Sequence, residues 1–504
     1  MMGALQTAKG LPQKALPFLT TALSIDRRSV PILSCYADAL TALGQWDEAL
    51  SNYDRALKLT PNDSIVLNQR GIVLRRLGRT EEAVHSFNRA LVVRPDYPAA
   101  LNNRATALQD MHRYEEAIAD YDRALAANCN NIQAWNNRGL ALLKLDRAQD
   151  AAASFRAGLA IQPNHPELLT NCGVALREMN QQPEAMAHFK RAAASDPDYA
   201  NARWNQGISA LLLGNFEEGL PLYEWRKRLT PAVEARDYAQ PLWTGRQDIA
   251  GKTLFLYVEQ GLGDAIQFYR FVAPLLARGA EVILSVPDRL LRLFENASPK
   301  VRLVGSQEAP PFDYHIPLMS VPLALGTTVA TIPAPTPYLA ADDRLIEYWR
   351  DRIGREGFKI GISWQGAPGG VGSRAMPLSC FEGLSRIAGV RLISLQKGPG
   401  TEQLALLPVV ESLGPEFDDG PNAFLDSAAL IENLDLVITL DSAMAHLAGA
   451  LNRPVWVALK QIPDWRWLLD RDDSPWYPSM RLFRQTQKGD WQQVFAAMQS
   501  LVGK

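Results

Sequence analysis

The chain has 504 residues, enough for about three globular domains. Hydrophobic residues make up 47% of it and charged residues 21%, a composition that excludes an intrinsically disordered chain. The formal net charge of -2 argues against a nucleic-acid-binding protein, because such proteins are usually basic.

The cysteines and the apolar runs indicate the cellular compartment in which the protein is expected. The four cysteines share no close spacing, so the sequence predicts neither a disulfide framework nor a zinc site and is typical of a reducing compartment. No apolar run approaches the length of a membrane span, and the N-terminus lacks a basic segment followed by an apolar core. We therefore expect a cytoplasmic protein without a membrane span.

Small residues recur every 34 positions through the first half of the chain. The three columns are Ala49, Ala83, Ala117, Ala151, Ala185; Ala56, Ala90, Ala124, Gly158, Ala192; and Ala37, Gly71, Ala105, Gly139, Gly173, Gly207. Small side chains let paired helices approach closely, and prolines close most units. The pattern resembles the tetratricopeptide repeat (TPR). We predict an array over residues 1–228, with a partial first repeat, full repeats at 30–63, 64–97, 98–131, 132–165 and 166–199, and a divergent last repeat.

A column of amides runs through the same register. Its members are Gln69, Asn103, Asn137, Asn171 and Asn205, on the first helix of each pair. That helix lines the inner surface of a TPR superhelix, where successive amides would hydrogen-bond an extended peptide. The alternative is that these amides hydrogen-bond between helices. Under either interpretation we expect the groove to bind a protein or peptide.

The second half alternates strand-like and helix-like segments after an irregular junction at residues 229–252. This alternation predicts parallel sheets with helices on both faces, in an N-terminal Rossmann-like lobe at 253–342 and a C-terminal lobe at 343–504. Ligand sites lie at the carboxyl ends of such strands, which places a cleft between the lobes. The last helix is expected at 490–501, with a possible crossing back to the first lobe. Strands are predicted at 253–258, 281–286, 301–304, 314–317, 359–364, 390–395, 436–440 and 455–459.

Residues 435–451, DLVITLDSAMAHLAGAL, are the stretch around which the second lobe is organised. A short apolar strand is followed by Asp441 and Ser442, which suit a helix N-terminus, and by a helix of small residues. Free N–H groups at such a turn, together with the helix dipole, form a site for phosphates. The alternative is an ordinary strand–helix unit.

The first lobe has a comparable turn, Gly261-Leu262-Gly263-Asp264, after its first strand. The glycines allow a tight turn and a close backbone approach. Asp264 at the mouth of the cleft would serve as a general base or as a helix N-cap, and the two uses are compatible.

Other candidates lie in the second lobe. Arg374 is the only cation of a loop that carries Gly366, Gly369, Gly370 and Gly372, and it suits phosphate binding or a plain surface position. Gln396 and Lys397 end the next strand, where they would meet a nucleotide or solvent. His446 lies one turn into the key helix, as a ligand contact or a buried core residue.

Several segments together resemble the bacterial TPR-linked glycosyltransferases: GLGDAIQFYRF, the glycine loop with Arg374, SLQKG, and above all LDSAMAHLAGALNRPVWVAL followed by DWRWLLDRDDSPWYPSMRLFRQ. Their catalytic half is similar to the heptosyltransferases, with the GT-B fold of two facing Rossmann-like lobes. The plan is also similar to that of the O-linked GlcNAc transferases, and some bacterial relatives glycosylate flagellin. The resemblance implies that Asp264 is the base and that Asp441, Ser442, Ala443 and His446, with the Gly261–Gly263 turn, bind the donor. The glycine loop lacks a lysine, so phosphate contact would fall on Arg374.

The function implied is metal-independent transfer of a sugar from a nucleotide-sugar donor, a substrate rather than a cofactor, to a protein acceptor selected by the TPR groove. The Asp470-Arg471-Asp472 motif does not follow a strand end, so no metal site is expected there. If Asp264 is only a cap, the base must be sought at Glu259 or His446. The alternative function is a TPR interaction scaffold with a non-catalytic glycosyltransferase-like module.

Overall fold

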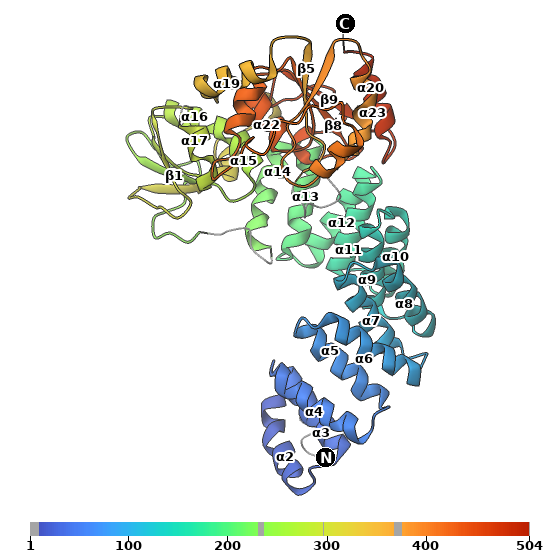
Figure 1. Ribbon diagram of the computed structural model, residues 1–504. Coiled ribbons are helices and arrows are strands. Elements are labelled where there is room, and N and C mark those ends of the chain that lie inside the picture. The colour runs from blue at the N-terminus through green and yellow to red at the C-terminus, as the bar shows by residue number, and fades with distance from the viewer. Residues whose placement is uncertain (1–9, 230–235, 296, 367–374, 503–504) are drawn as a thin grey trace. The chain divides into compact units, whose positions relative to one another are not determined.

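The computed structural model describes residues 10–229, 236–295, 297–366 and 375–502 (Figure 1). It divides into two compact units, Met1–Pro197 and Asp198–Lys504. The first unit is helical, and the second holds the last helix pair together with two parallel sheets. The boundary between compact units thus falls one helix pair before the boundary at residue 228 that was drawn from the repeats.

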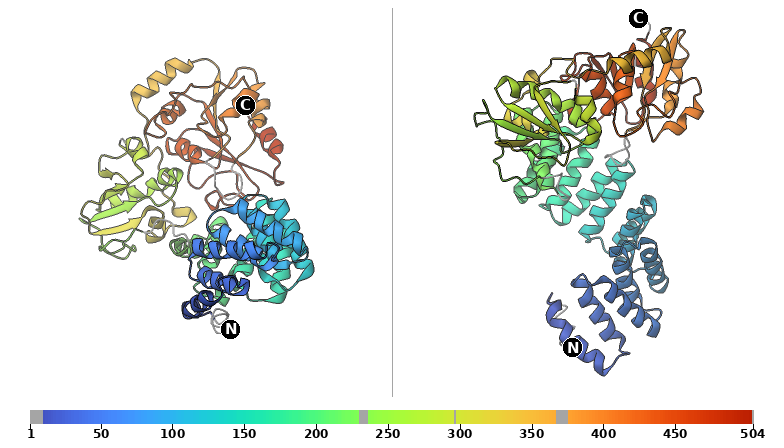
Figure 2. Two further views of the ribbon diagram at one scale, coloured as in Figure 1. Left: turned by 60° about the horizontal axis from the view of Figure 1, so that its bottom comes forward. Right: turned by 60° about the vertical axis from the view of Figure 1, so that its left-hand side comes forward.

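The helices of the first unit follow the predicted 34-residue register. The right-hand view of Figure 2 shows successive helices lying side by side along the unit. Consecutive helices pack in pairs, and each pair packs on the next. The partial first repeat contributes α2. The helices are α2 Pro12–Ile25, α3 Val30–Ala42, α4 Trp46–Leu59, α5 Ser64–Arg76, α6 Thr80–Val93, α7 Pro98–Asp110, α8 Tyr114–Ala127, α9 Ile132–Lys144, α10 Ala148–Ile161, α11 Pro166–Glu178 and α12 Gln182–Ser195.

The column of small residues works by making room for aromatic rings. A Cβ atom built on Gly139 would lie 2.4 Å from Cε1 of Phe155, a separation that real Cβ atoms do not show. Phe155 is fully buried, so the two helices of this repeat approach until the ring rests on the glycine backbone. The same contact recurs one repeat later and two repeats earlier, in the pairs Gly173–Phe189 and Gly71–Phe87.

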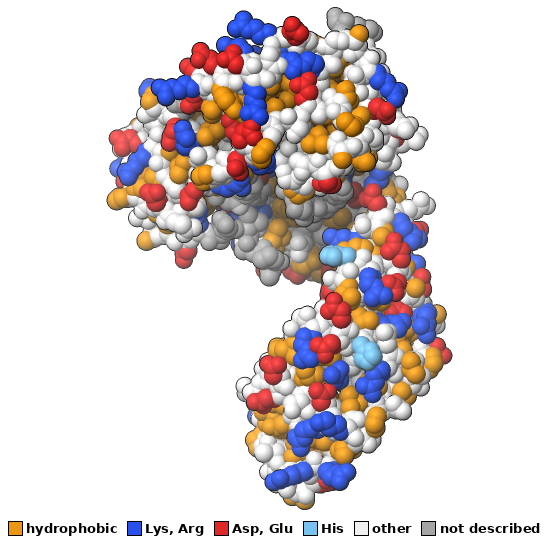
Figure 3. All heavy atoms as spheres, viewed as in Figure 1, with side chains coloured by type: hydrophobic (Ala, Val, Ile, Leu, Met, Phe, Trp, Pro, Cys, Tyr) orange, Lys and Arg blue, Asp and Glu red, His pale blue; other side chains and the backbone are white. Residues whose placement is uncertain are grey.

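Charged side chains of both signs cover the exposed faces of the helices. In the view of Figure 3, basic and acidic groups are interspersed along the repeats. Ion pairs recur at the start of the second helix of several repeats, as in Arg79–Glu82, Arg113–Glu116 and Arg147–Asp150. These exposed pairs contribute little stability each, but they neutralise the surface locally. This face therefore lacks the basic stripe that nucleic-acid binding requires.

The second unit begins with α13 (Ala200–Leu212), α14 (Phe216–Tyr223) and the short 3-10 helix η1 (Glu224–Arg228). Its first sheet has the order β3-β2-β1-β4, with all strands parallel. The strands are β1 Thr253–Tyr257, β2 Glu281–Ser285, β3 Val301–Val304 and β4 Tyr314–Pro317. One face packs on α15 (Leu262–Phe268), α16 (Val272–Ala277) and α17 (Leu291–Phe294).

The opposite face of the first sheet differs from the expected helical cover. Phe255 and Tyr257 of β1 pack there against Tyr238 and Phe312, which come from irregular segments. The connection at residues 305–313 is shorter than the dozen or so residues that a helical crossover usually needs. Aromatic side chains therefore cover this face in place of a helix.

The second sheet is parallel and has the order β6-β5-β7-β8-β9, with helices on both faces. Its strands are β5 Phe358–Ile362, β6 Val390–Ser394, β7 Leu436–Leu440, β8 Val455–Leu459 and β9 Met480–Arg484. Longer elements around it are α19 Asp343–Ile353, α21 Leu425–Ile431, α22 Ala443–Ala450 and α23 Trp491–Gln499, with the single turns α20 Glu382–Ser385, η6 Leu378–Phe381, η7 Thr401–Leu406 and η8 Trp465–Trp467. None of the helices described is both long and apolar enough to cross a membrane.

Three elements differ in detail from the sequence-based expectations. The helix expected after the glycine turn is divided into α15, a 3-10 turn and α16, because Pro274 in α16 lacks the N–H that would continue the ladder. The edge strand β9 was missed. The last helix, α23, packs against α20 and β9 of its own lobe instead of crossing back, because Val494, Phe495 and Met498 belong to that lobe's core.

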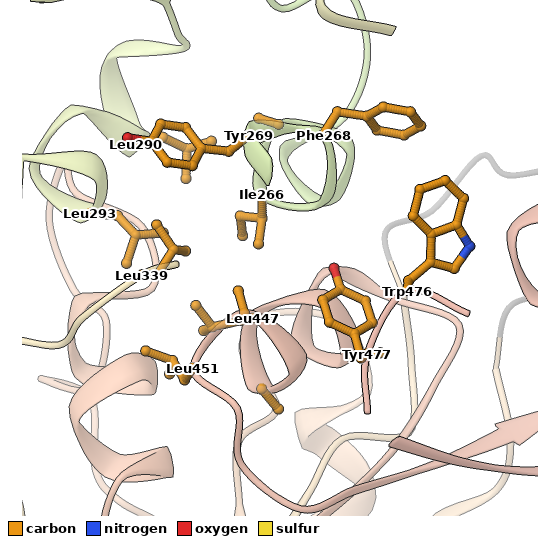
Figure 4. Packing of buried hydrophobic residues seen from close by; sticks show 14 of the residues in the cluster. Ile266, Phe268, Tyr269, Leu290, Leu293, Leu339, Leu447, Leu451, Trp476 and Tyr477 are labelled. Carbon is orange, nitrogen blue, oxygen red and sulfur yellow. The ribbon is translucent and has the colours of Figure 1, made fainter. Parts of the chain in front are cut away.

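The two sheets of this unit meet through α15 and α22. Figure 4 shows Ile266 of α15 and Leu447 of α22 pointing toward one another, with Leu451 below and Tyr477 alongside. Ile266 and Leu447 are fully buried and belong to one continuous core that spans both sheets. The expected interlobe cleft therefore does not extend between these two helices.

Candidate active site

The glycine turn at the end of β1 needs glycine because it packs closely against α22, and not because its backbone angles are unusual. Gly261 precedes α15 with φ -65° and ψ 165°, angles open to any residue. Gly263 is required for another reason: a Cβ there would lie 3.1 Å from Cα of Ala443 and 3.3 Å from Cδ2 of His446. The turn thus rests directly on the first turn of α22.

Asp264 is held on both oxygens. Its Oδ2 accepts a hydrogen bond of 3.0 Å from the backbone N–H of Gly261. Gly261 is the N-cap of α15, so Asp264 occupies the third helical position and not the N-cap position considered from the sequence. Its Oδ1 forms a salt bridge with Arg466, although the side chain keeps about 20% of its surface exposed. A carboxylate offers about four lone-pair sites, so both bonds leave room for a further donor.

Arg466, the partner of Asp264, was not singled out as a site residue in the sequence analysis. It lies in η8, and Nη1 donates to Asp464 over 2.7 Å while Nε donates to Gln267 of α15 over 2.9 Å. Burial by itself lowers the pKa of Arg466, but Asp464 and Asp264 outweigh it and raise that pKa well above its ordinary value. The cation is therefore permanent, and it ties the Asp264 carboxylate to the other sheet. Asp264 and Arg466 are 202 positions apart, so only their proximity in the fold reveals the pair.

The start of α22 has the predicted strand–turn–helix form. β7 is buried along its whole length, and Ser442 occupies the N-cap position with an extended backbone. The Ser442 hydroxyl makes no capping hydrogen bond and lies 3.1 Å from Oγ1 of Thr439 instead. The Ser442 side chain therefore does not block the first N–H groups of α22. Asp441, Ser442 and Ala443 are each half-buried.

His446 is buried in the second unit's core. Its ring stacks on Trp467 at a centroid distance of 5.3 Å and an interplanar angle of 11°, and Nδ1 lies 3.2 Å from the hydroxyl of Tyr477. The imidazole is also the nearest side chain to Gly263. It thus forms part of the surface on which the glycine turn packs.

Gln396 and Lys397 are occupied by their own lobe. The Gln396 amide oxygen accepts from the backbone N–H groups of Trp364 and Gln365, at 3.1 and 3.0 Å, and its nitrogen donates to two carbonyls. Lys397 donates to the carbonyl of Phe417 over 2.6 Å. Both lie at the carboxyl edge of the sheet, with β5 between them and β7. Arg374 and Gly369, Gly370 and Gly372 lie outside the described residues, and Gly366 is half-buried.

A second buried arginine joins the sheets near the same helices. Arg270, in the turn after α15, donates to the carbonyl of Pro333 over 3.0 Å and to the hydroxyl of Tyr338 over 3.2 Å. Its guanidinium carbon lies 4.4 Å from the ring centroid of Tyr477. Burial alone lowers the pKa of Arg270, and the two tyrosines more than reverse this effect.

The amide column makes contacts between and within repeats. Asn103 donates to Asn68 and Asn171 donates to Asn136, each over 2.9 Å, so each bond joins one repeat to the preceding one. Gln69 donates to Asp38 over 3.3 Å, and Asn137 accepts from Gln133 over 2.9 Å. Asn205, in the second unit, donates to the carbonyl of Asn201. Asn68 and Asn136 are 68 residues apart, which is twice the repeat length, and this neighbouring column was not singled out from the sequence.

The described residues contain no group of three or more His, Cys, Asp or Glu side chains arranged to hold a metal ion. In the Asp470-Arg471-Asp472 motif, Arg471 forms a salt bridge of 2.6 Å with Asp473, the residue that follows the motif.

Comparison with known proteins adds to this description. Two models of the tetratricopeptide repeat match residues 28–95 and residues 102–166 and 173–226. The model of glycosyltransferase family 9 (heptosyltransferase) matches residues 420–459, which contain β7, α22 and β8. The chain therefore consists of a TPR solenoid and an α/β half, part of which is similar to family 9 glycosyltransferases.

Similar proteins cover parts of the chain. Protein FlbA of Caulobacter vibrioides is 30% identical over 311 residues, which are 56% of this chain and 51% of FlbA, so the chain spans about half the length of that relative. Among solved structures, the TPR protein YrrB is 22% identical over 36% of this chain and 95% of its own, with a TM-score of 0.33. PilF of Pseudomonas aeruginosa is 18% identical over 40% of this chain and 92% of its own, with a TM-score of 0.36.

Proposed function

We propose that the chain is a glycosyltransferase of the GT-B type, which transfers a sugar from a nucleotide-sugar donor to a protein acceptor selected by the repeats. The observation that carries this proposal is the contact between two strand–helix turns. The Asp264 turn of the first sheet rests on the first turn of α22 in the second sheet, at Ala443. A candidate base and a candidate phosphate site therefore adjoin each other.

The reaction proposed is a direct displacement. The acceptor hydroxyl gives its proton to the Asp264 carboxylate as its oxygen attacks the sugar's anomeric carbon, and the bond from that carbon to the phosphate oxygen breaks. The departing nucleotide gains negative charge, which the dipole and the N–H groups at the start of α22 stabilise. Arg466 fixes the orientation of the Asp264 carboxylate.

A donor screen tests this proposal. The protein is incubated with UDP-, GDP-, ADP- and CMP-linked sugars and with candidate acceptors, with and without EDTA, and sugar transfer and donor hydrolysis are measured. Flagellin is the first acceptor to test, because the resemblance described above includes flagellin-modifying enzymes. We expect transfer from one donor class that survives EDTA. The absence of both transfer and hydrolysis across the panel would count against the enzyme.

A second candidate function is a TPR scaffold with a non-catalytic glycosyltransferase-like half. It is favoured by Gln396 and Lys397, whose polar atoms are already bonded to their own lobe's backbone. The discriminating measurement is thermal stabilisation, because a ligand that binds only the native state raises the melting temperature. If none of the four nucleotide classes shifts the second unit's transition, the scaffold gains support.

The repeats are proposed to select the acceptor through the amide column. Replacing Asn103 and Asn171 by alanine should impair modification of a full-length protein acceptor and leave donor hydrolysis unchanged. Each change also breaks a bond to the preceding repeat. The control therefore replaces the partners Asn68 and Asn136, which keeps the column. It removes the same bonds and, in addition, those from Asn68 to Gln69 and from Asn136 to Glu167. Equal effects of the two double variants would show that the column is structural.

A further inference from the structure

The end of the last repeat reaches into the first sheet of the second unit. Arg226, in η1, exposes only 1% of its surface, yet every nitrogen of its guanidinium has a partner. Nε donates to Glu259 over 2.5 Å, Nη1 to Glu224 over 2.6 Å, and Nη2 to the hydroxyl of Ser320 over 2.8 Å. One side chain thus joins the repeat to the ends of both β1 and β4.

Its main partner stands directly before the glycine turn. Glu259 follows β1, and its side chain is only 3% exposed. The next residue, Gln260, donates from its amide to the hydroxyl of Tyr223, which ends α14, over 3.2 Å. The last repeat therefore holds two consecutive residues, Glu259 and Gln260, immediately ahead of Gly261 and the turn that carries Asp264.

The burial of a charged pair, Arg226 and Glu259, is not explained by a gain in stability. Burying two charges costs solvation energy, and well-packed apolar residues of similar volume often stabilise a protein equally well. Arg226 instead fixes the orientation of its partners, because its planar guanidinium donates hydrogen bonds to several acceptors at once. Glu259 is thereby fixed, and Asp264 lies only five residues further along the chain.

We propose that Arg226 is a positioning residue, which holds Glu259 and Gln260 so that the following turn presents Asp264 in its working orientation. The last repeat is then a structural part of the transfer site and not only part of the acceptor-binding array. This inference rests on the proposed function for its catalytic consequence, but its structural consequence is independent of any activity.

The test compares Arg226→Met with Arg228→Met in the full chain. Arg228 lies on the same short helix, but its side chain is 64% exposed and its nearest carboxylate, on Asp198, is 3.6 Å away. Hydrogen–deuterium exchange is measured over residues 258–266. We expect faster exchange there in Arg226→Met and unchanged exchange in Arg228→Met. Unchanged exchange in both variants would overturn the positioning role, whether or not a sugar donor is ever found.

Kinetics give the second readout. Relative to the parent protein, Arg226→Met should lower kcat by about 10²-fold, the cost of a misplacement of about 1 Å, with the donor KM nearly unchanged. Arg226→Lys restores one ion pair but not the several directed hydrogen bonds of the guanidinium, so its kcat should lie between those of the parent protein and of Arg226→Met. If the parent transfers no sugar from any donor, the proposed function fails, while the exchange result still decides the positioning role.

Glu259→Gln keeps the inference testable if Arg226→Met does not fold. It preserves the size of the side chain and leaves Arg226 its ion pair with Glu224. It should accelerate exchange in the same turn and lower kcat in the same direction. A Glu259→Gln variant with both properties at parent values would contradict the proposal.

Discussion

The role of Asp264 is decided at the scale of single residues. Asp264→Asn keeps the side chain's size and its ability to accept the hydrogen bond from the N–H of Gly261, the N-cap of α15, but it removes the basic carboxylate. If Asp264 is the general base, transfer should fall by roughly 10²–10⁴-fold, the usual contribution of such a group. Nucleotide binding should change little. The measurement is kcat/KM for transfer, with nucleotide-induced stabilisation measured in parallel.

The salt bridge to Arg466 calls for a control, because Asp264→Asn also weakens that pair. Asp464→Asn is matched to it, since Asp464 binds the same guanidinium over 2.7 Å and caps η8. It reduces the charge around Arg466 and leaves the carboxylate of Asp264 in place. An equal loss of transfer in the two variants would assign the effect to the ion network, and near-normal turnover of Asp264→Asn would end its case as the base.

Substitutions at Gly263 and Gly261 test whether the glycine turn is needed for its close approach to α22 or only for the turn itself. Gly263→Ala places a methyl group 3.1 Å from Cα of Ala443, so α15 and α22 must shift apart by a few tenths of an ångström. Gly261→Ala meets only the flexible Asp264 carboxylate, at 3.3 Å. We expect Gly263→Ala to lower both thermal stability and nucleotide binding, and Gly261→Ala to affect them much less. Equal behaviour of the two variants would show that the contact with α22 is unimportant.

At the scale of elements, the repeats test how tightly the small-residue column is packed. An alanine in place of glycine usually stabilises a helix interior by roughly 0.5–1 kcal/mol. At Gly139 the added methyl would overlap the buried ring of Phe155, so Gly139→Ala should instead lower the free energy of unfolding by about 1–3 kcal/mol. Chemical denaturation measures the difference.

A control for that prediction lies in the same repeat. Gly158 belongs to α10, and the atom nearest to its added Cβ is Cδ1 of Leu168, at 2.8 Å, the end of a flexible side chain. Both Leu168 and Phe155 are fully buried, but the branched end of Leu168 can change rotamer, whereas the added methyl at Gly139 overlaps three atoms of a rigid ring. Gly158→Ala should therefore cost less than Gly139→Ala. A stabilised Gly139→Ala variant would mean that the helix pair can open without loss.

Some helices, strands and contacts could be predicted from the sequence, and others could not. β7 and α22 were predicted correctly because a buried strand and a small-residue helix leave strong local patterns. β9 was missed because Arg481 and Arg484 interrupt the apolar pattern of an edge strand. The partner of Asp264 was missed because the pairing with Arg466 depends on the fold, and no periodicity encodes it. The fusion of the last repeat with the α/β half, through Arg226 and Glu259, is of the same kind.

At the scale of the whole molecule, the division at residue 197 predicts how the chain unfolds. Each unit has its own buried core, with Phe87 and Tyr121 in the first and Ile266 and Leu447 in the second. We therefore expect two calorimetric transitions, since separate cores need not unfold together. The last repeat should melt with the α/β half, because Arg226 and Tyr223 are bonded to that half.

Two perturbations assign these transitions. Gly139→Ala, in the first unit, should lower only the transition of the repeats. A nucleotide that binds at α22 should raise only the other transition, by about 2.7 kcal/mol of stabilisation at a concentration of 100 times its Kd. Asp264→Asn should leave that shift intact, because the first turn of α22, and not the carboxylate, is proposed to hold the phosphates. A single transition that responds to both the repeat variant and the nucleotide would show that the units unfold as one, and the donor site would then be coupled to the repeat array along the whole chain.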